Sequence, residues 1–460
     1  MFEKVSAQLV SRLRALVGEK RVLTGDAIGA DYGHDELPNS VSHLPEAVVE
    51  AGSTDDVAAV MKLCGEFNIP VTVRGAGTGR AGGSVPVEGG VLLSLRELNS
   101  ILAFDAEARL LTVQPGVLLQ DVKAEAARHG LYYPPDPGEK TATIGGNAST
   151  DASGPCAVKY GGTRAYIADA LCVLADGSAA RLSGNAALAA VIGSEGTLAV
   201  ITELTLRLVE KPGCEVILLL PFADAGSCLA AAGKILAAGL DPAVLEYLDT
   251  DIVEFSGRVT GEPVFPVEMD GERVGATLMV TLEAGDDDAL DGKMEAVAEL
   301  AEELECLDIL VVDTPTLKRS VWDAHDAFHT AMESGAKCAD EINLAIAPDK
   351  LAELIGFAKA EGEERGLRAL CYAHAGSGGV HIHAVSDGAK DEFLPAMAAF
   401  NAAVCARCAQ LGGDLGGEYG LGYAKRACLK AALGDEKYGE LVSRKTFFDP
   451  KGILNPGKII

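Results

Sequence analysis

The sequence predicts an α+β protein of two or three domains, and three observations support this. Its 460 residues exceed the size of one ordinary domain. In the first half, a β-branched run, Val71 to Val73, enters a glycine-rich stretch, and a second apolar run, Val91 to Leu95, follows it. After about Pro212 strand-like and helix-like segments alternate, which is typical of helices packed on an antiparallel sheet.

The first half is organised around the glycine-rich stretch, residues 69–84, which has glycines at 75, 77, 79, 82 and 83. Glycine tolerates positive φ and lets the backbone approach a ligand closely. Successive backbone N–H groups in such a turn form a concavity that binds anions, and Arg74 can add a positive charge. The stretch therefore predicts a phosphate site, with an ordinary glycine-rich hairpin as the alternative from these residues alone.

Gly77, Gly79 and Gly82 also match the pattern G-x-G-x-x-G of the Rossmann fold. That fold needs a helix to open at the last glycine. Here Pro86 and a glycine pair follow, and then the strand-like run 91–95. We therefore reject the Rossmann interpretation.

The composition argues against certain classes of binding partner and favours one cellular compartment. The formal net charge of −28 argues against nucleic acid and anionic membrane surfaces. The N-terminus has no apolar signal segment, and no apolar run is long enough to span a membrane. The 11 scattered cysteines favour reduced thiols and a cytoplasmic location. Cys405 and Cys408, in a helical-looking stretch, are interpreted as buried thiols and not as a redox or metal pair.

Local patterns place most elements along the chain. Ser53 is predicted to cap a helix with acidic residues in its first turn, and Gly130 to end another. Helices are expected over about 1–20, 54–67, 119–129, 225–238, 286–305, 349–365 and 392–410. Strands are expected over 45–51, 71–73, 91–95, 110–116, 170–175, 216–220, 276–282, 307–312 and 369–373. Segments 133–138 and 141–149 are expected as loops whose hydroxyl and amide groups suit a second phosphate or a flavin edge.

Six segments in this order resemble the FAD-binding flavoproteins of the vanillyl-alcohol oxidase and p-cresol methylhydroxylase superfamily. Within it, the chain is similar to the branch of D-lactate dehydrogenase, the glycolate oxidase flavoprotein subunit and D-2-hydroxyglutarate dehydrogenase. The resemblance covers roughly residues 40–460. The segments are Arg74–Gly79, Pro134–Pro137, Thr143–Asn147, Lys159–Gly161, Gly193–Leu198 and Leu454–Lys458.

The resemblance implies an N-terminal helical segment, 1–37, and a two-part FAD-binding domain of the p-cresol methylhydroxylase (PCMH) type, 38–212. An α+β cap with an antiparallel sheet would follow over 213–460, with 412–460 returning to the flavin. Relatives with covalent flavin carry a histidine in the glycine-rich stretch. Thr78 stands there, so non-covalent FAD is expected.

The resemblance also implies which residues contact the cofactor. The pyrophosphate would be held by Arg74, Gly75, Ala76, Gly77, Thr78, Gly79 and Gly82. The flavin and its chain would be lined by Thr141, Gly145, Gly146, Asn147 and Ser153, and Pro135 is also counted among the cofactor-binding residues. Gly196 and Ile201 would contact the adenine side, and Asn455 would return from the C-terminus.

Relatives bind a divalent metal, usually zinc, through two histidines of a glycine-rich hairpin and a later glutamate. The matching residues are His374, His381 and Glu418. Imidazole and carboxylate at an open site suit zinc or another transition metal. Surface histidines around a glycine turn are the alternative for this patch alone.

The same segments depart from the family at three positions that touch the chemistry. His325 stands where relatives have an arginine that clamps the substrate carboxylate, and Tyr419 stands at the family's catalytic histidine. His383 replaces an asparagine. These three are the candidate catalytic residues, and His383 is open to three interpretations: a base, a further metal ligand or a partly exposed strand residue.

The resemblance implies an FAD-dependent dehydrogenase of a small 2-hydroxy acid such as D-lactate or glycolate. The electron acceptor would be an electron-transfer flavoprotein or an iron–sulfur subunit, because the chain has no iron–sulfur motif of its own. A different hydroxy acid, and a decayed flavin-binding electron-transfer subunit, are the alternatives. The oligomeric state stays open, a homodimer included.

Overall fold

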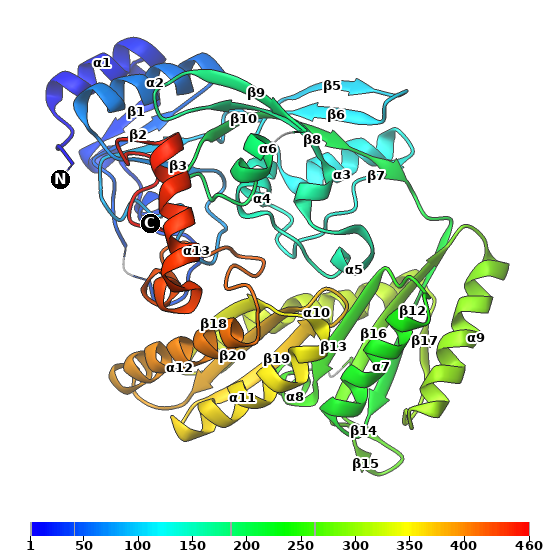
Figure 1. The fold of residues 1–460 in the computed structure, drawn as a ribbon. Coiled ribbons are helices and arrows are strands. Elements are labelled where there is room, and N and C mark those ends of the chain that lie inside the picture. The colour runs from blue at the N-terminus through cyan, green and yellow to red at the C-terminus, as the bar shows by residue number, and fades with distance from the viewer. Residues whose placement is uncertain (1, 41, 185, 262–263, 460) are drawn as a thin grey trace. The chain divides into compact units, whose positions relative to one another are not determined.

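The computed structural model describes residues 2–40, 42–184, 186–261 and 264–459 (Figure 1). The chain divides into two compact units. The first comprises 1–152, 162–211 and 419–460, and the second comprises 153–161 and 212–418. In the part of the chain that is described, no helix is both long and apolar enough to cross a membrane.

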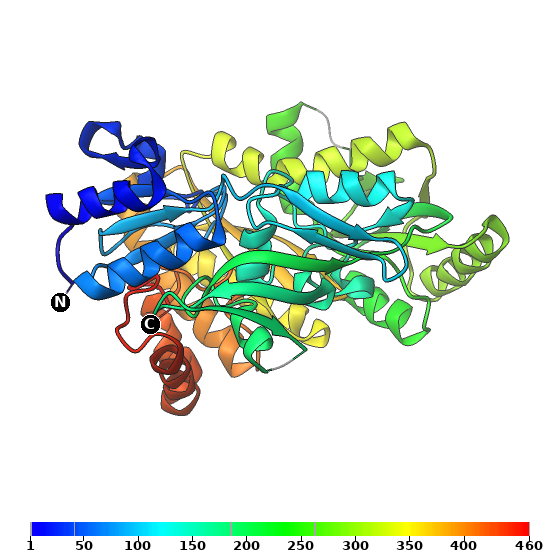
Figure 2. The same cartoon turned by 90° about the horizontal axis from the view of Figure 1, so that it is seen from above.

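The first unit begins with a small sheet in the order β1-β2-β4-β3. β2, β4 and β3 run parallel, and β1 pairs with β2 antiparallel. Figure 2 shows the blue helices α1 and α2 beside this sheet. They share a continuous core with it, in which Leu9, Leu13, Val60 and Met61 are fully buried. The bounds are α1 Ala7–Val17, β1 Val22–Thr24, β2 Ala47–Glu50, α2 Thr54–Phe67, β3 Val71–Arg74 and β4 Val91–Ser94.

This sheet decides how the glycine-rich stretch is held. β3 and β4, which flank it, are parallel neighbours, so the hairpin alternative is wrong. A strand follows the glycines, as the sequence predicts, and the Rossmann arrangement is absent from this described segment. The stretch is therefore a crossover connection at the carboxyl end of β3.

The second sheet of this unit is antiparallel, in the order β5-β6-β10-β8-β9. Its strands are β5 Ile101–Asp105, β6 Leu110–Val113, β8 Ile167–Val173, β9 Ala179–Ser183 and β10 Val200–Arg207. The short strands β7 Leu131–Tyr132 and β11 Val209–Glu210 pair with each other. The helices are α3 Leu119–Arg128, α4 Ile144–Thr150, α6 Ala186–Val191 and α13 Arg426–Phe448.

The chain returns to the first sheet at its C-terminal end. Leu454 forms a parallel bridge with Val71, and the Asn455 amide donates to the Val71 carbonyl. Both views show the red C-terminal segment beside the blue strands (Figures 1 and 2).

The second unit is built on an antiparallel sheet in the order β17-β12-β16-β13-β19-β20-β18. Its strands are β12 Cys214–Phe222, β13 Val244–Asp249, β16 Ala276–Ala284, β17 Leu310–Val312, β18 Cys338–Ala345, β19 Arg368–His374 and β20 Gly379–Ser386. A small hairpin joins β14 Glu268–Met269 to β15 Glu272–Arg273. The helices are α5 Ala157–Tyr160, α7 Ala225–Ala237, α8 Thr250–Thr260, α9 Asp287–Glu303, α10 Pro315–Gly335, α11 Leu351–Glu364 and α12 Lys390–Gln410.

Helices α8 and α10 cover one face of this sheet. Their Ile252, Val321 and Phe328 share a core with Val244 and Tyr372 of the strands. Side chains alternate between the two faces of a strand, so Glu246 of β13 and His374 of β19 point to this same face. The candidate site lies on it.

The structure differs from the expected elements at several places. Residues 144–150, expected within a loop, form the helix α4, because Thr143 caps its N-terminus and accepts a hydrogen bond from Gly146 N–H. Helices α6, α8, α10 and α13 and strands β5, β13 and β18 have no counterpart among the expected elements. The helix α13 is kinked at Gly434, whose φ of 75° is not helical.

Candidate functional site

The glycine-rich stretch forms an open backbone cradle in the first unit. Gly77 and Gly82 have φ of 84° and 75°, which other residues rarely adopt. A Cβ on Gly77 would collide with the guanidinium of Arg74, and one on Gly75 with the hydroxyl of Thr143. Gly75 and Gly77 leave no room for a side chain, because the Thr143 hydroxyl and the Arg74 guanidinium lie directly against the backbone.

Arg74 is buried at the carboxyl end of β3, and its Nη1 donates to the His34 carbonyl at 2.6 Å. This bond holds the guanidinium beside the cradle. Asp35 directly follows His34 in the chain. The arrangement suits a phosphate, which needs a fixed positive charge and free N–H groups.

Helix α4 presents a buried amide near this cradle. Asn147 is 4% exposed, and its side-chain nitrogen has no hydrogen-bond partner within the described residues. Gly145 is required by packing, because a Cβ there would collide with Pro115. A buried donor of this kind needs an acceptor, and a bound cofactor would supply one. The cradle and Asn147 together fit a dinucleotide cofactor.

Asn455 ties the cradle to two other segments. Its Oδ1 accepts from Val73 N–H at 3.2 Å, and its Nδ2 donates to the carbonyls of Gly83 at 3.1 Å and Glu195 at 2.7 Å. Gly196, with φ of 68°, packs against this side chain. The amide of Asn455 is thus used to hold the backbone in place.

The sequence interpretation missed Glu195. Its buried carboxylate accepts from the N–H groups of Leu421 at 2.6 Å and Gly422 at 2.7 Å. It therefore fixes the loop that follows Tyr419. A glutamate within the glycine-rich run 193–198 was the available signal.

The remaining predicted cofactor residues are placed as follows. Ala76, Thr78 and Gly79 belong to the cradle, and Gly146 lies in the first turn of α4. Ile201 is buried in β10, and Pro135 is buried in the segment before Thr141. Thr141 is exposed, and its hydroxyl donates to Glu139 at 2.5 Å. Ser153 belongs to the second unit, where its hydroxyl donates to Glu418 Oε1 at 3.0 Å.

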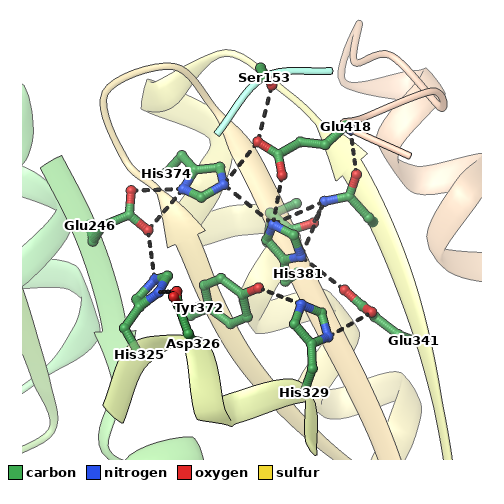
Figure 3. A network of polar contacts seen from close by, with 12 residues as sticks. Ser153, Glu246, His325, Asp326, His329, Glu341, Tyr372, His374, His381 and Glu418 are labelled. Carbon is green, nitrogen blue, oxygen red and sulfur yellow. Dashed lines mark hydrogen bonds and ion pairs between the residues drawn. The ribbon is translucent and has the colours of Figure 1, made fainter. Parts of the chain in front are cut away.

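The second unit brings the three predicted metal ligands together (Figure 3). His374 Nε2 lies 3.0 Å from Glu418 Oε1, and His381 Nε2 lies 3.5 Å from Glu418 Oε2. The two Nε2 atoms are 3.4 Å apart. All three residues are buried, at 2–8% exposure, so the alternative of surface histidines is wrong.

Each ligand histidine is backed by a carboxylate on its other nitrogen. His374 Nδ1 lies 2.7 Å from Glu246 Oε1, and His381 Nδ1 lies 2.8 Å from Glu341 Oε1. Such carboxylates fix the ring and direct Nε2 towards a metal. Glu246 stands directly opposite His374 in the pairing of β13 with β19. This donor set therefore fits a transition metal.

The buried histidines and carboxylates of this cluster shift each other's pKa values. Burial alone would lower the pKa of His374, but Glu246 and Glu418 outweigh it and raise this pKa well above its ordinary value. Burial would raise the pKa of Glu418, but His374 and His381 hold it well below its ordinary value. The imidazoles and carboxylates of the cluster thus stabilise each other's charged forms.

The three candidate catalytic residues lie in different surroundings. His325, on α10, is buried behind the triad: its Nε2 is 3.3 Å from Glu246 Oε2 and its Nδ1 is 3.4 Å from Asp326. His383, on β20, is 3% exposed, so the alternative of a partly exposed residue is wrong. Tyr419 is half-buried in a turn directly after Glu418.

Glu246, His329, Glu341 and Tyr372 also belong to the cluster, and the sequence interpretation missed all four. His329 follows His325 by one helical turn, which was a usable signal on α10. Glu246 and Glu341 are acids inside apolar strands. Their partners come from distant strands, so sequence spacing alone does not reveal the contacts.

Known families match both parts of the chain. Residues 45–183 match the family described as FAD binding domain, and residues 211–459 match FAD linked oxidases, C-terminal domain. The chain is 38% identical to a D-lactate dehydrogenase of Anaerostipes hadrus, over 100% of this chain and 98% of that protein. It is 31% identical to a glycolate oxidase subunit of Bacillus subtilis, over 93% of this chain and 91% of that protein.

Among solved structures, p-cresol methylhydroxylase with substrate bound is similar with a TM-score of 0.81. The match covers 98% of this chain and 96% of that one at 19% identity. This likeness shows the fold alone.

Proposed function

We propose that this chain, which belongs to the FAD-linked oxidases of the vanillyl-alcohol oxidase and p-cresol methylhydroxylase superfamily, oxidises a small 2-hydroxy acid of the D-lactate or glycolate type. The names of the relatives support this substrate class. The observation that carries the proposal is the buried triad of His374, His381 and Glu418. A metal held by these three side chains would keep room for substrate oxygens, and a 2-hydroxy acid offers a hydroxyl and a carboxylate.

The proposal assigns the cofactor residues as expected from the sequence. Arg74 and the cradle would hold the FAD pyrophosphate, and Asn147 would donate to the flavin part. Bound FAD supplies the hydride acceptor of the reaction. We expect the FAD to be non-covalent, so acid precipitation should release the yellow colour into the supernatant. Colour retained in the pellet would contradict this.

Arg74→Ala should weaken FAD binding by roughly 1.5–3 kcal/mol, because it removes a charge-assisted contact. Equilibrium dialysis against FAD measures the change. Arg96→Ala, an exposed arginine of the same unit, is the control. Equal FAD affinity in the two variants would remove Arg74 from the site.

In the second unit, the proposed metal is zinc, which would lower the pKa of the substrate hydroxyl. Glu246 and Glu341 keep the two histidine rings oriented. His325 acts through Glu246 and is therefore assigned a positioning role. His383 is the proposed proton acceptor, because the ordinary pKa of imidazole suits proton abstraction at neutral pH and that of a phenol such as Tyr419 does not.

The role of His383 can be separated from metal binding. His383→Asn should sharply reduce the rate of flavin reduction while zinc content stays unchanged. A fall in zinc content would make His383 a ligand. If neither quantity changes, Tyr419 becomes the candidate, and Tyr419→Phe is the next variant to measure.

The substrate proposal is tested by anaerobic bleaching of the flavin absorbance. D-lactate or glycolate should bleach it, and the electrons would then pass to an electron-transfer flavoprotein or an iron–sulfur subunit. Bleaching by another hydroxy acid alone would support a second candidate, a dehydrogenase of a different substrate. This candidate is favoured by the position of His325, which contacts Glu246 and Asp326. No bleaching by any hydroxy acid would contradict both.

A further inference from the structure

A second group of metal-ligating side chains lies on the far side of His381 from Glu418 (Figure 3). His381 Nδ1 is 2.8 Å from Glu341 Oε1, and His329 Nδ1 is 3.2 Å from Glu341 Oε2. The ligand atoms of His329, Glu341 and His381 all lie within 4.8 Å of one another. One carboxylate thus faces two imidazole nitrogens, one from each of its oxygens.

Three elements hold this group in place. Glu341 lies on β18 and His381 on β20, which are antiparallel neighbours, and His329 reaches them from helix α10. The side chains of Glu341 and His381 are 3% and 2% exposed, and that of His329 is 25% exposed. The group is therefore rigid at its base and accessible at His329.

The second nitrogen of His329 is also engaged. Its Nε2 lies 3.0 Å from the hydroxyl of Tyr372. The ring of Tyr372 stacks on His381, with centroids 4.2 Å apart and planes at 4°. This contact directs His329 Nδ1 at Glu341, and an oriented second nitrogen is what metal-ligating histidines have.

Glu341 has more partners than an orienting carboxylate requires. One oxygen of Glu341 is enough to orient the ring of His381. The other oxygen of Glu341 faces His329. In addition, His383 Nε2 lies 4.0 Å from Glu341 Oε1. Glu341 is thus a buried carboxylate with three imidazole rings around it.

We infer that His329, Glu341 and His381 form a second metal site, which takes a transition-metal cation and shares His381 with the site of the proposed function. His381 bridges the two sites, with Nε2 towards His374 and Glu418 and Nδ1 towards Glu341 and His329. Two imidazoles and a carboxylate select zinc or a similar metal over magnesium or calcium. For the metal to bind, His381 Nδ1 and His329 Nδ1 give up the protons that they direct at Glu341, and these protons leave to solvent.

Zinc content tests this inference directly. The FAD-loaded protein is incubated with Zn²⁺, freed of unbound metal by gel filtration, and analysed for zinc and flavin by mass spectrometry and absorbance. We expect two zinc ions per chain. The variants His329→Ala and Glu418→Gln should each hold one. The double variant should hold almost none. His129→Ala changes an exposed histidine that contacts Glu125 in the first unit, and it should keep two.

The outcomes separate this inference from the proposed function. One zinc per chain that His329→Ala leaves in place would overturn the second site and keep the first. One zinc that His329→Ala removes and Glu418→Gln leaves would support the second site and contradict the first. Flavin content and melting temperature show that each variant is folded. Should His329→Ala fail to fold, His329→Gln takes its place, because an amide keeps a polar group towards Tyr372.

Discussion

Asp35 is a buried acid beside the glycine cradle. It is 5% exposed, and its Oδ1 accepts from Leu37 N–H at 3.2 Å. Burial raises the pKa of Asp35 from 3.8 to about 6, although the Leu37 N–H and Arg74 act in the opposite direction. The charged carboxylate is thus poorly solvated in the folded protein.

This shift gives a pH-dependent stability with a definite sign. The pKa of Asp35 is higher in the folded than in the unfolded chain, so its favourable contribution is complete below about pH 4 and lost as the pH rises through about 6. Above that, the cost is on the order of 3 kcal/mol. Asp35→Asn should therefore raise the melting temperature at pH 7.5 more than at pH 4.5. Asp31→Asn, at an exposed position, is the control.

The measurement is thermal unfolding of the FAD-free protein at both pH values. An equal shift for Asp35→Asn at pH 4.5 and pH 7.5 would show that the folded carboxyl titrates normally.

At the scale of elements, the β19–β20 hairpin positions the two histidines of the candidate metal site. His374 ends β19, and His381 lies in β20, opposite Tyr372. The turn between the strands contains Gly378, with φ of 92°. A Cβ on Gly378 would collide with the carbonyl of Ile346. The turn therefore has no room for a side chain.

Gly378→Ala should displace the hairpin turn and with it His374. We expect a loss of about 3 kcal/mol, the sum of a backbone cost and a steric cost, together with a lower zinc content. Gly366→Ala is a matched control, because Gly366 has φ of 69° but nothing within 4 Å of the added Cβ. It should lose about 1–2 kcal/mol and keep its zinc. Equal zinc content in the two variants would refute the role of the turn.

At the scale of the whole molecule, the cofactor and metal residues separate by unit. The cradle, Asn147, Gly196 and Asn455 belong to the first unit, and the three proposed metal ligands belong to the second. The single tryptophan, Trp322, lies on α10 in the second unit. Tryptophan fluorescence therefore reports on the second unit, and release of fluorescent flavin reports on the first.

Removal of the metal should consequently destabilise one unit and spare the other. A metal present at 100 times its Kd stabilises the folded state by about 2.7 kcal/mol. A strong chelator, or His374→Ala, should lower the melting temperature seen by Trp322 and leave the temperature of flavin release unchanged. Flavin that is lost together with the metal would show that the two sites do not bind independently.

Much of the fold and part of the site could be predicted from the sequence, because these features are local. The glycine stretch between two apolar runs indicated the cradle, and Ser53 indicated the start of α2. His374, His381 and Glu418 were identified by their match to known segments, and the structure brings them together. Residues 144–150 were misjudged, since glycines typical of a loop occupy the first turn of a helix.

The composition of the site beyond these ligands was decided by tertiary structure. Glu246 meets His374 across 128 residues of chain, and Glu341 meets His381 across 40. These contacts depend on which strands pair with each other and in which register. The alternation of apolar and polar residues along a strand indicates only which of its faces is buried. The sequence by itself thus determined the family and the residues of the candidate triad. Strand pairing and the docking of α10 decided that Glu246, His325, His329 and Glu341 surround it.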